Sequence, residues 1–279
     1  MITGSSWQEE CVQAPDGGRL FQRAHRVENP QKTLLVIHGL GEHGGRYEPL
    51  ASILAQRGIS TYCPDLRGHG RSPGQRGHLL SWDTLMQDVG SCLASIQVQV
   101  AKTPVVILGH SLGGLIAIRS AGMFQERLAA LILSAPYLGL ARPVPYSLRL
   151  LVHALNAFVP RLPLKNGVDP RNLSHIESEV KAYREDPLVH PWITPRSFTE
   201  IEKAIREAAD DAQRIRIPTL LILPGRDAIC STAASLEWFK LLRSPRKQAI
   251  VYPESLHEPL NDLDRNRFLG DVVRWLGEI

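Results

Sequence analysis

Short apolar runs alternate with amphipathic segments along most of the chain. Several of the runs are almost continuously apolar, which is typical of strands buried on both faces of a sheet. The segments between them repeat apolar residues at helical spacing. Alternating strands and helices build a parallel sheet with helices on both faces, so the pattern predicts an α/β fold. The expected strands are residues 33–38, 59–64, 105–109, 129–134, 219–224 and 248–252, and the expected helices are residues 46–57, 81–100, 111–125, 232–242 and 264–276.

This alternation is interrupted in two places. Near the start, Asp16-Gly17-Gly18 is a turn signal followed by the loosely alternating residues 19–27, which predicts a hairpin. Residues 138–211 contain many prolines, about three helical pieces and no convincing strand. An insert of this kind is expected to cover the carboxyl ends of the strands, where parallel sheets bind ligands. We therefore predict a core of residues 1–137 and 212–279 with a helical cap of residues 138–211; surface helices without a role are the alternative.

Composition narrows the class of protein. The 279 residues are 43% hydrophobic and 22% charged, which excludes a disordered chain. The net charge is +4, and the basic residues form no dense run. The charge pattern therefore argues against a nucleic-acid partner but leaves attraction to an anionic lipid surface open. It does not predict the oligomeric state.

Targeting and cofactor signals are not evident. The first ten residues lack the basic and apolar regions of a signal peptide, and the longest apolar stretch, residues 150–160, is shorter than the ~20 residues that span a bilayer. Neither the histidines nor the cysteines have ligand spacing, so we expect no metal and no organic cofactor. We expect a cytoplasmic protein, with peripheral membrane contact left open. The cysteines, which show no paired spacing, are Cys11, Cys63, Cys92 and Cys230.

The sharpest local motif is Gly109-His-Ser-Leu-Gly-Gly114, which follows a predicted strand and opens a predicted helix. This strand–turn–helix context is the one that a nucleophile elbow requires. We therefore predict that Ser111 is a nucleophile. The backbone N–H of Leu112 would then stabilise the oxyanion of a tetrahedral intermediate.

A serine nucleophile needs a base, and in this kind of fold the chain order is serine, acid, histidine. His153, His175 and His190 follow Ser111 but fall in the expected cap. His257 comes five residues after the last predicted strand, in a loop at the carboxyl edge. We therefore predict His257 as the base.

Asp227 lies three residues beyond the predicted strand 219–224, at the same edge of the sheet. It is our candidate for the acid that orients the base. Asp65 precedes the serine and violates the expected order. Asp262 is expected to cap the last helix instead.

A second oxyanion donor should come from the loop after an early strand. The glycine-rich stretch His38-Gly-Leu-Gly-Glu-His-Gly-Gly-Arg-Tyr47 lies there and offers the backbone N–H of Leu40. It lacks the Lys-Ser/Thr of a phosphate-binding P-loop.

Together these motifs resemble the monoacylglycerol lipase and lysophospholipase group of α/β-hydrolases. The resemblance covers about residues 33–275 and implies a mostly parallel central sheet with helices on both faces and a helical cap insert. The matching stretches are His38-Gly-Leu-Gly-Glu-His43 with Arg46-Tyr47, Asp65-Leu-Arg-Gly-His-Gly-Arg-Ser72, Gly109–Gly114, Tyr183-Arg-Glu-Asp-Pro-Leu188, Gly225-Arg-Asp-Ala-Ile229 and His257.

The resemblance also implies roles for individual residues. Glu42 and Arg46 would pair and shape the polar end of a pocket near the leaving alcohol; a purely structural ion pair is the alternative. Tyr183 would hydrogen-bond that alcohol, or merely pack, and His110 would line the same end. Some relatives have a cysteine near the pocket at the position of Cys230. We favour the interpretation that Cys230 is a small buried residue rather than part of the pocket. The 65–72 loop is expected to be a structural turn.

These observations predict a serine hydrolase that cleaves esters of single-chain lipids through an acyl-enzyme on Ser111, most simply monoacylglycerol. The apolar segment 144–159 could line an acyl tunnel, touch a membrane or simply pack. A lysophospholipase or short-chain carboxylesterase is the alternative, and an inactive binding module fits less well. A peptidase would need carboxylates in the cap to hold an amine; the candidates are Glu177, Glu179, Glu185 and Asp186.

Overall fold

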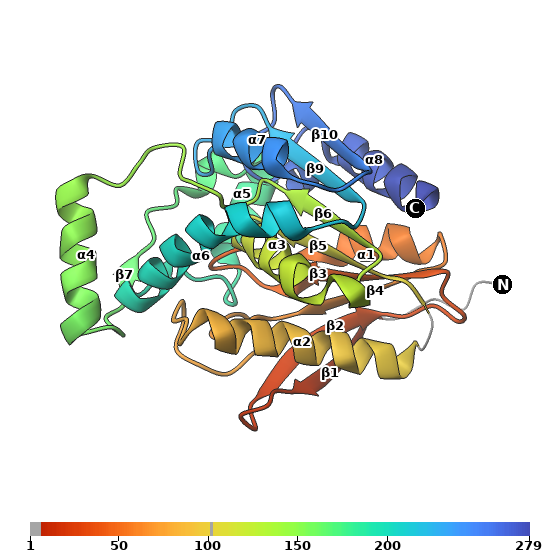
Figure 1. Cartoon of the computed structure of the whole chain (residues 1–279), viewed down its shortest axis with the longest axis horizontal. Coiled ribbons are helices and arrows are strands. Elements are labelled where there is room, and N and C mark those ends of the chain that lie inside the picture. The colour runs from red at the N-terminus through yellow and green to blue at the C-terminus, as the bar shows by residue number, and fades with distance from the viewer. Residues whose placement is uncertain (1–6, 101–102) are drawn as a thin grey trace.

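The computed structural model describes residues 7–100 and 103–279 and is built around one large sheet (Figure 1). Its described strands follow the order β1-β2-β4-β3-β5-β6-β9-β10. The hairpin β1–β2 is antiparallel and joins β4 antiparallel, whereas every pair from β4 to β10 is parallel. The strands are β1 Trp7–Gln13, β2 Arg19–His25, β3 Lys32–Ile37, β4 Ile59–Pro64, β5 Val105–His110, β6 Ala130–Ser134, β9 Thr219–Pro224 and β10 Lys247–Tyr252.

Helices cover both faces of the sheet and enclose two apolar cores. Because side chains alternate along a strand, Leu35 and Ile37 of β3 face one core and Leu34 and Val36 face the other. The first core is closed by α2 Trp82–Gln99, α3 Leu112–Phe124, α6 Pro195–Arg214 and α7 Thr232–Leu241; the second is closed by α1 Glu48–Ala55 and α8 Arg265–Glu278.

The predicted fold class is confirmed, and the predicted strands and helices are found within a few residues of their expected ends. One difference is the helix expected at 46–57, which divides into the 3-10 turn η1 Gly44–Tyr47 and α1. Pro49 lies in the first turn of α1, where its missing N–H is not needed and its fixed φ suits the start of a helix. Two more 3-10 turns are η2 Gln125–Arg127 and η4 Pro259–Asn261.

The segment between β6 and α6 lies beside the carboxyl ends of the central strands, with α4 at its outer edge (Figure 1). The expectation that it contains no strand was wrong. Leu164 pairs with Ile193 and Lys165 pairs with Trp192 in a separate antiparallel ribbon. Strands of two residues are too short to show alternation, so the sequence pattern could not reveal them. The elements are α4 Tyr146–Phe158, β7 Leu164–Lys165, η3 Pro170–Asn172, α5 Glu177–Glu185 and β8 Trp192–Ile193.

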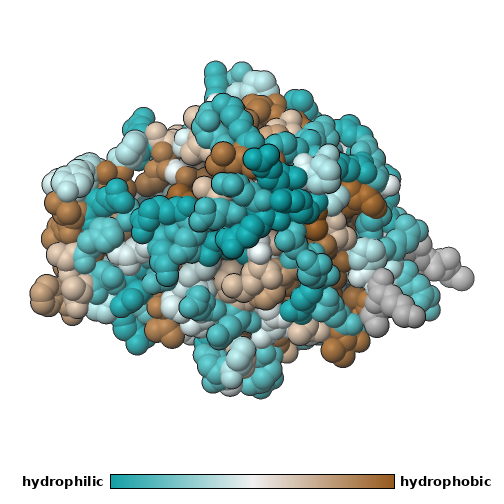
Figure 2. Space-filling view, in the orientation of Figure 1, coloured by the Kyte–Doolittle hydropathy of each residue, from teal (hydrophilic) through white to brown (hydrophobic). Residues whose placement is uncertain are grey.

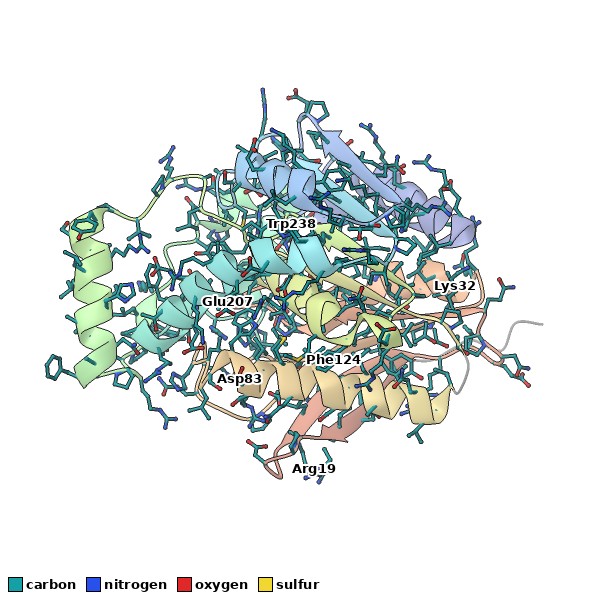
Figure 3. All side chains as sticks on the ribbon, viewed as in Figure 1. Arg19, Lys32, Asp83, Phe124, Glu207 and Trp238 are labelled. Atoms are coloured by element: carbon teal, nitrogen blue, oxygen red, sulfur yellow. The ribbon has the colours of Figure 1, made fainter. Side chains whose placement is uncertain are left out.

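Helix α6 connects this segment to the sheet. Its small residues Ala204, Ala208 and Ala212 are buried in the first core. The indole Nε1 of Trp238 on α7 donates to the Ala208 carbonyl oxygen at 2.8 Å, and Glu207, the preceding residue of α6, accepts from Arg119 of α3 at 2.6 Å. Trp238 and Glu207 are labelled in Figure 3. Since α6 contacts both α4 and α3, it joins the segment that precedes it to the sheet and its helices.

Within the described residues, we find no helix with both the length and the apolar character needed to cross a bilayer.

Candidate active site

Ser111 lies between β5 and α3 with a backbone conformation that non-glycine residues rarely adopt. Its φ is 53° and its ψ is −120°. The conformation is maintained by backbone hydrogen bonds: the Ser111 N–H donates to the Ser134 carbonyl at 3.0 Å, and the Ser111 carbonyl accepts from Tyr137 N–H at 2.9 Å. A strained residue held by its surroundings at a strand end is typical of functional sites. The turn therefore has the geometry of the predicted elbow.

Two glycines make this tight turn possible. A Cβ atom on Gly109 would lie 2.1 Å from the Gly113 carbonyl oxygen, and one on Gly113 would lie 2.0 Å from the Ile37 carbonyl oxygen. Any side chain at either position would force the start of α3 away from β3 and β5. The glycines thus allow α3 to begin directly against the sheet, with Ser111 above the strand ends.

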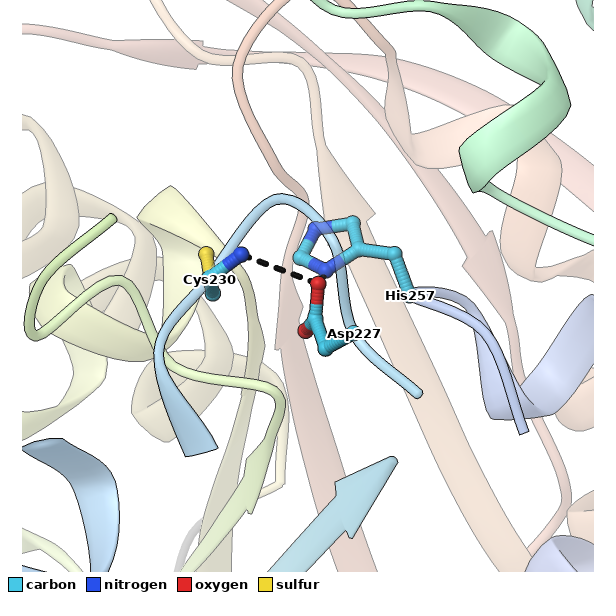
Figure 4. A group of neighbouring side chains, drawn as sticks. All are labelled: Asp227, Cys230 and His257. Carbon is cyan, nitrogen blue, oxygen red and sulfur yellow. Dashed lines mark hydrogen bonds and ion pairs between the residues drawn. The ribbon is translucent and has the colours of Figure 1, made fainter. Parts of the chain in front are cut away.

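His257 and Asp227 form a buried pair at the same edge. The His257 Nδ1 lies 2.8 Å from Asp227 Oδ2, and the two side chains are 4% and 1% exposed. Asp227 Oδ1 accepts the backbone N–H groups of Ile229 and Cys230, the latter drawn in Figure 4. With Nδ1–H donated to the carboxylate, Nε2 of a neutral His257 is left as an acceptor. This arrangement suits a base held by an acid.

The pair is also electrostatically coupled. Burial lowers the pKa of His257, but the Asp227 carboxylate, with smaller contributions from Glu258 and Glu42, raises it above its ordinary value. Burial raises the pKa of Asp227, while His257 and the two backbone N–H groups bring it below its ordinary value. The arrangement therefore favours an ionised acid beside a base that gains a proton readily.

The structure brings this pair together with Ser111. Ser111 and His257 both line one cavity, and the ring of His110 lies 4.9 Å from that of His257 between centroids. The loops after β5, β9 and β10 supply these residues, and all three strands end at the same edge.

The first rival acid, Asp65, binds backbone groups of its own loop and of η1, not His257. It is fully buried, and its carboxylate accepts the backbone N–H groups of Gly44 and Arg71, each at 2.8 Å, with Arg23 nearby. It joins the loop after β4 to the start of η1. This agrees with the predicted structural turn.

The second rival, Asp262, was expected to cap the last helix, and this was wrong. Asp264 is the residue that precedes α8. Asp262 instead accepts the backbone N–H groups of His175 at 2.8 Å and Leu256 at 2.7 Å. It therefore links the cap segment to the loop that carries His257.

The loop after β3 passes beside Ser111. A Cβ atom on Gly39 would lie 3.2 Å from the Ser111 Cβ, and Leu40 lines the cavity. His38 anchors the loop, because its Nδ1 bonds the Gly39 carbonyl at 2.8 Å and its Nε2 accepts Leu66 N–H at 2.9 Å. Leu112 is the first residue of α3, where a backbone N–H has no intrahelical partner. Both predicted oxyanion donors thus belong to segments that adjoin the serine.

A buried ionic cluster lies on the other side of His257. Arg46 donates from Nη1 to Glu42 Oε2 at 2.7 Å, which is the pairing expected from the sequence. It also forms a bidentate pair with Glu258 at 2.7 and 2.6 Å. Sequence reasoning missed Glu258; the available signal was a carboxylate directly beside the candidate base. The ring of Tyr183 lies over the guanidinium, 4.8 Å from its carbon atom.

The cluster keeps its carboxylates ionised. Burial raises the pKa of Glu42, but Arg46 and the neighbouring histidines lower it to about 2. Burial likewise raises the pKa of Glu258, and Arg46 brings it below its ordinary value. Burial lowers the pKa of His110 to about 4, with a further contribution from His257. His110 is therefore neutral at physiological pH.

A cavity of about 480 Å³ lies above Ser111. Its walls are largely apolar on the cap side, and its polar groups gather on the core side. Core residues in its wall are Gly39, Leu40, Glu42, His110, Ser111, Tyr137, Ile229, Cys230, His257 and Glu258. Cap residues in its wall are Leu140, Val144, Leu148, Val152, Leu164, Lys165, Asn166, Gly167, Val168, Leu173, Tyr183, Ile193, Thr194 and Phe198.

Cys230 differs from the expectation for it. It is buried, but its Sγ lies 3.9 Å from Ser111 Oγ and lines the cavity. The prediction favoured a residue with no face toward the pocket, and this was wrong. The backbone N–H of Cys230 donates to Asp227 Oδ1 at 2.9 Å, and in the loop held this way the thiol faces the serine. Burial raises the pKa of this thiol well above its usual range.

Metal-ligating side chains meet at one place among residues 7–100 and 103–279. Asp227, Cys230 and His257 bring one ligand atom each within 4.8 Å of one another (Figure 4). The carboxylate and the imidazole already bond each other there. The geometry thus matches an acid and its base more directly than a metal site.

The acidic residues considered for amine binding in the cap lie away from the cavity wall. Glu179 bonds Arg265, and Asp186 bonds His43 of the core loop. Glu177 and Glu185 are exposed on α5. The cap carboxylates therefore have structural or surface positions.

A serine on a strained strand–helix turn, above a parallel sheet and beside a histidine–aspartate pair, defines an α/β-hydrolase. The profile of the family described as "Serine aminopeptidase, S33" matches residues 28–264. The chain belongs to this family.

Relatives support a narrower grouping. A mouse monoglyceride lipase is 30% identical over 267 residues, covering 94% of this chain and 88% of the relative. Phospholipase YtpA of Bacillus subtilis is 28% identical over 242 residues, covering 86% and 93%. The crystal structure of a Paleococcus ferrophilus monoacylglycerol lipase superimposes with a TM-score of 0.85 at 32% identity, covering 92% of this chain and 98% of that one.

Proposed function

We propose that this protein is a serine hydrolase that cleaves carboxylic esters of single-chain lipids, with monoacylglycerol as its preferred substrate. The observation that carries the proposal is the cavity above Ser111, which is apolar toward the cap and polar toward Glu42, His110 and Glu258. The similarity to monoacylglycerol lipases supports it.

The proposed reaction uses a catalytic triad. Ser111 Oγ attacks the ester carbonyl while His257 Nε2 takes its proton, and Asp227 orients the imidazole and stabilises the imidazolium. The backbone N–H groups of Leu40 and Leu112 stabilise the oxyanion. The imidazolium protonates the leaving alcohol, and an acyl-enzyme remains on Ser111. Water activated by His257 then releases the fatty acid.

The substrate would lie across the cavity. The acyl chain fits the apolar wall formed by cap residues such as Val152, Leu164 and Phe198. The glycerol would lie near Glu42, His110 and Tyr183, with Arg46 holding the glutamates in place. Polar groups that the correct substrate satisfies would remain unpaired with a bare alkyl ester, which gives strong discrimination.

We also propose that residues 138–211 act as the cap of a core formed by 1–137 and 212–279. A roofed cavity of about 480 Å³ suits one acyl chain, whereas a second chain would need space that the cap fills. Monoacylglycerols should therefore be preferred over di- and triacylglycerols.

Helix α4 supports a further part of the proposal, a transient contact with a membrane surface. Tyr146, Leu150, Leu151 and Phe158 expose 73%, 52%, 53% and 86% of their surface. Figure 2 shows this hydrophobic strip along the outer edge of the cap. Val152 on the same helix faces the cavity. We propose that α4 rests on a bilayer carrying anionic lipids and receives the substrate from it. The exposed cation Arg142 lies just before the strip, whereas Arg149 within α4 pairs with Glu202 at 2.7 Å.

We place the protein in the cytoplasm as part of the same proposal. The four cysteines, all within the described residues, are free, which fits a reducing compartment.

A lysophospholipid is the second candidate substrate. The similarity to phospholipase YtpA favours it, and a lysophospholipid also carries one acyl chain.

The test is a side-by-side rate measurement on mono-, di- and triolein in matched micelles, with lysophosphatidylcholine, p-nitrophenyl butyrate and aminoacyl amides in parallel. We expect monoolein to be cleaved fastest by a wide margin. Ser111→Ala is the inactive reference, with kcat lower on the order of 10⁶-fold. Triolein turnover equal to that of monoolein would overturn the single-chain cavity, and a dominant amide rate would replace the esterase with a peptidase.

A further inference from the structure

The ionic cluster beside His257 carries an unbalanced charge. Two buried carboxylates, Glu42 and Glu258, share the single guanidinium of Arg46. The three side chains are only 5%, 6% and 11% exposed. Arg46 lowers the pKa of both carboxyls against the effect of burial, so both stay ionised at neutral pH. The cluster therefore has a net charge of −1, and this charge lies in a poorly hydrated part of the protein.

The negative groups of the cluster face the cavity and the positive group does not. Among the described residues, Glu42 and Glu258 line the cavity wall but Arg46 does not. The Tyr183 ring, which does line the wall, lies over the guanidinium at 4.8 Å. A ligand in the cavity therefore meets carboxylates and an aromatic ring before it meets the cation.

Each carboxylate also keeps capacity for a ligand. Glu42 Oε1 accepts from Gly39 N–H and the Tyr47 hydroxyl, whereas its Oε2 accepts from Arg46. Glu258 Oε2 accepts from Arg46 and Asn261, whereas its Oε1 accepts from Arg46. Since a carboxylate offers about four acceptor positions, Glu42 Oε2 and Glu258 Oε1 each retain one. Hydroxyl or ammonium hydrogens can use them, and an anion cannot.

The other charged groups at the cavity do not reverse this balance. Asp227 adds a further negative charge behind His257, and burial holds His110 neutral by lowering its pKa to about 4. Lys165 also lines the cavity, but it is an exposed side chain on β7 of the cap. Its charge is hydrated and contributes less than a buried one.

We propose that Glu258, together with Glu42, makes the alcohol end of the cavity a charge filter that accepts esters of neutral polyols and of cationic amino alcohols and rejects esters whose alcohol carries a net negative charge. Glu258 is a specificity-determining residue in this proposal, which rests on the ester hydrolase function proposed above. A choline ester of a fatty acid is thereby an expected substrate, because its trimethylammonium group, which has no N–H to donate, is still attracted by the net negative charge.

The first experiment uses the unmodified protein and three esters with the same acyl chain. They are monooctanoylglycerol, octanoylcholine and octanoyl glycerate, in which a carboxylate replaces one CH₂OH of the glycerol. At pH 8 we expect kcat/KM for octanoylcholine within about tenfold of that for monooctanoylglycerol, and kcat/KM for the glycerate at least about 100-fold lower, as a like charge in a dry site would cause. Comparable rates for all three esters would overturn the filter while leaving the hydrolase function intact. No cleavage of any ester would instead reject the proposed function.

The second experiment assigns the filter to Glu258. Glu258→Gln keeps the size and a hydrogen-bonding carbonyl but removes one charge, so the glycerol-to-glycerate ratio of kcat/KM should fall about tenfold or more. The matched control is Glu254→Gln, which makes the same change on a side chain of the same loop that is 63% exposed. Its ratio should not change. If folded Glu258→Gln keeps the glycerol-to-glycerate ratio of the unmodified protein, Glu258 is not the filter. The same conclusion follows if Lys165→Gln changes this ratio and Glu258→Gln does not. If Glu258→Gln does not fold, the comparison of the three esters on the unmodified protein still decides the proposal.

Discussion

At the scale of single residues, the candidate site contrasts two buried aspartates with similar contacts. Asp227 and Asp65 each accept two backbone N–H groups. Only Asp227 also bonds an imidazole in the cavity wall. The two carboxylates have the same chemistry, but they have different roles because only Asp227 lies beside an imidazole at the cavity.

Exchanging each carboxylate for an amide should separate these roles experimentally. Asp227→Asn should lower kcat on the order of 10⁴-fold with the fold retained, because an amide favours the wrong imidazole tautomer. Asp65→Asn should leave kcat nearly unchanged but lower the melting temperature by several degrees, since one buried N–H loses its acceptor. The measurements are kcat on monoolein and thermal unfolding. Inactive but folded Asp65→Asn beside active Asp227→Asn would reverse the assignment of the acid.

The thiol beside Ser111 makes a second prediction at this scale. N-Ethylmaleimide should inhibit by modifying Cys230, because the adduct would occupy the cavity next to Ser111 Oγ. The reaction should be slow at pH 7 and faster at higher pH, since burial raises the pKa of the thiol. Cys230→Ala should resist the inhibitor, whereas Cys11→Ala, which removes an exposed cysteine, should not. Equal inhibition of both variants would place the sensitive thiol elsewhere.

At the scale of elements, the helices α4 and α6 have different positions: α6 packs on the core, and α4 lies at the surface. Helix α6 packs through its alanines on α3, so it is anchored to the core. Helix α4 contacts α6 and exposes much of its surface, although Val152 faces the cavity. One helix can therefore contact a bilayer and a bound acyl chain at once.

Removing part of the apolar strip tests this arrangement. The double variant Leu151→Ser/Phe158→Ser should bind phosphatidylcholine/phosphatidylglycerol vesicles about 10- to 100-fold more weakly, because two side chains no longer enter the bilayer interface. The control is the double variant Val98→Ser/Leu263→Ser. It replaces two residues outside the cap whose exposed fractions are 84% and 65%. Binding is measured by vesicle sedimentation at low and high salt. Equal binding of both variants would reject α4 as the docking element.

At the scale of the whole molecule, the charges around His257 come from three distant segments, at 42–46, 227 and 257–258. Burial lowers the pKa of His257, but Asp227 first and then Glu258 and Glu42 raise it above the ordinary value. The resting base is therefore easier to protonate than a free histidine, and it needs a higher pH to become neutral.

This coupling predicts a pH profile. The base must be neutral, so kcat/KM for monooctanoylglycerol should rise with pH through an inflection above 6.5, the ordinary value for histidine. In Glu258→Gln the inflection should move to lower pH, because one charge that stabilises the imidazolium is gone. Glu254→Gln should keep the original inflection. Identical profiles for all three proteins would show that the cluster does not act on the base.

Much of the fold and of the site could be predicted from sequence because the signals are local. The buried strand β5 is apolar from Val105 to Leu108, and the elbow glycines stand at fixed offsets from Ser111. Asp227 and His257 follow the ends of their strands by three and five residues. Parallel strands end at one edge of a sheet, so residues that follow them are expected to meet. Periodicity and topology together were sufficient for the candidate triad.

Other features depended on contacts between distant segments. The amino-acid sequence by itself determined the alternation of strands and helices, the elbow and the order of the candidate triad, since these depend on neighbours in the chain. Only the tertiary structure decided that Glu258 shares Arg46 with Glu42, that the Cys230 thiol faces Ser111, and that Asp262 joins the cap to the base loop. The direction of a buried side chain is set by what packs around it, and residues about 90 to more than 200 positions apart in this chain do that packing.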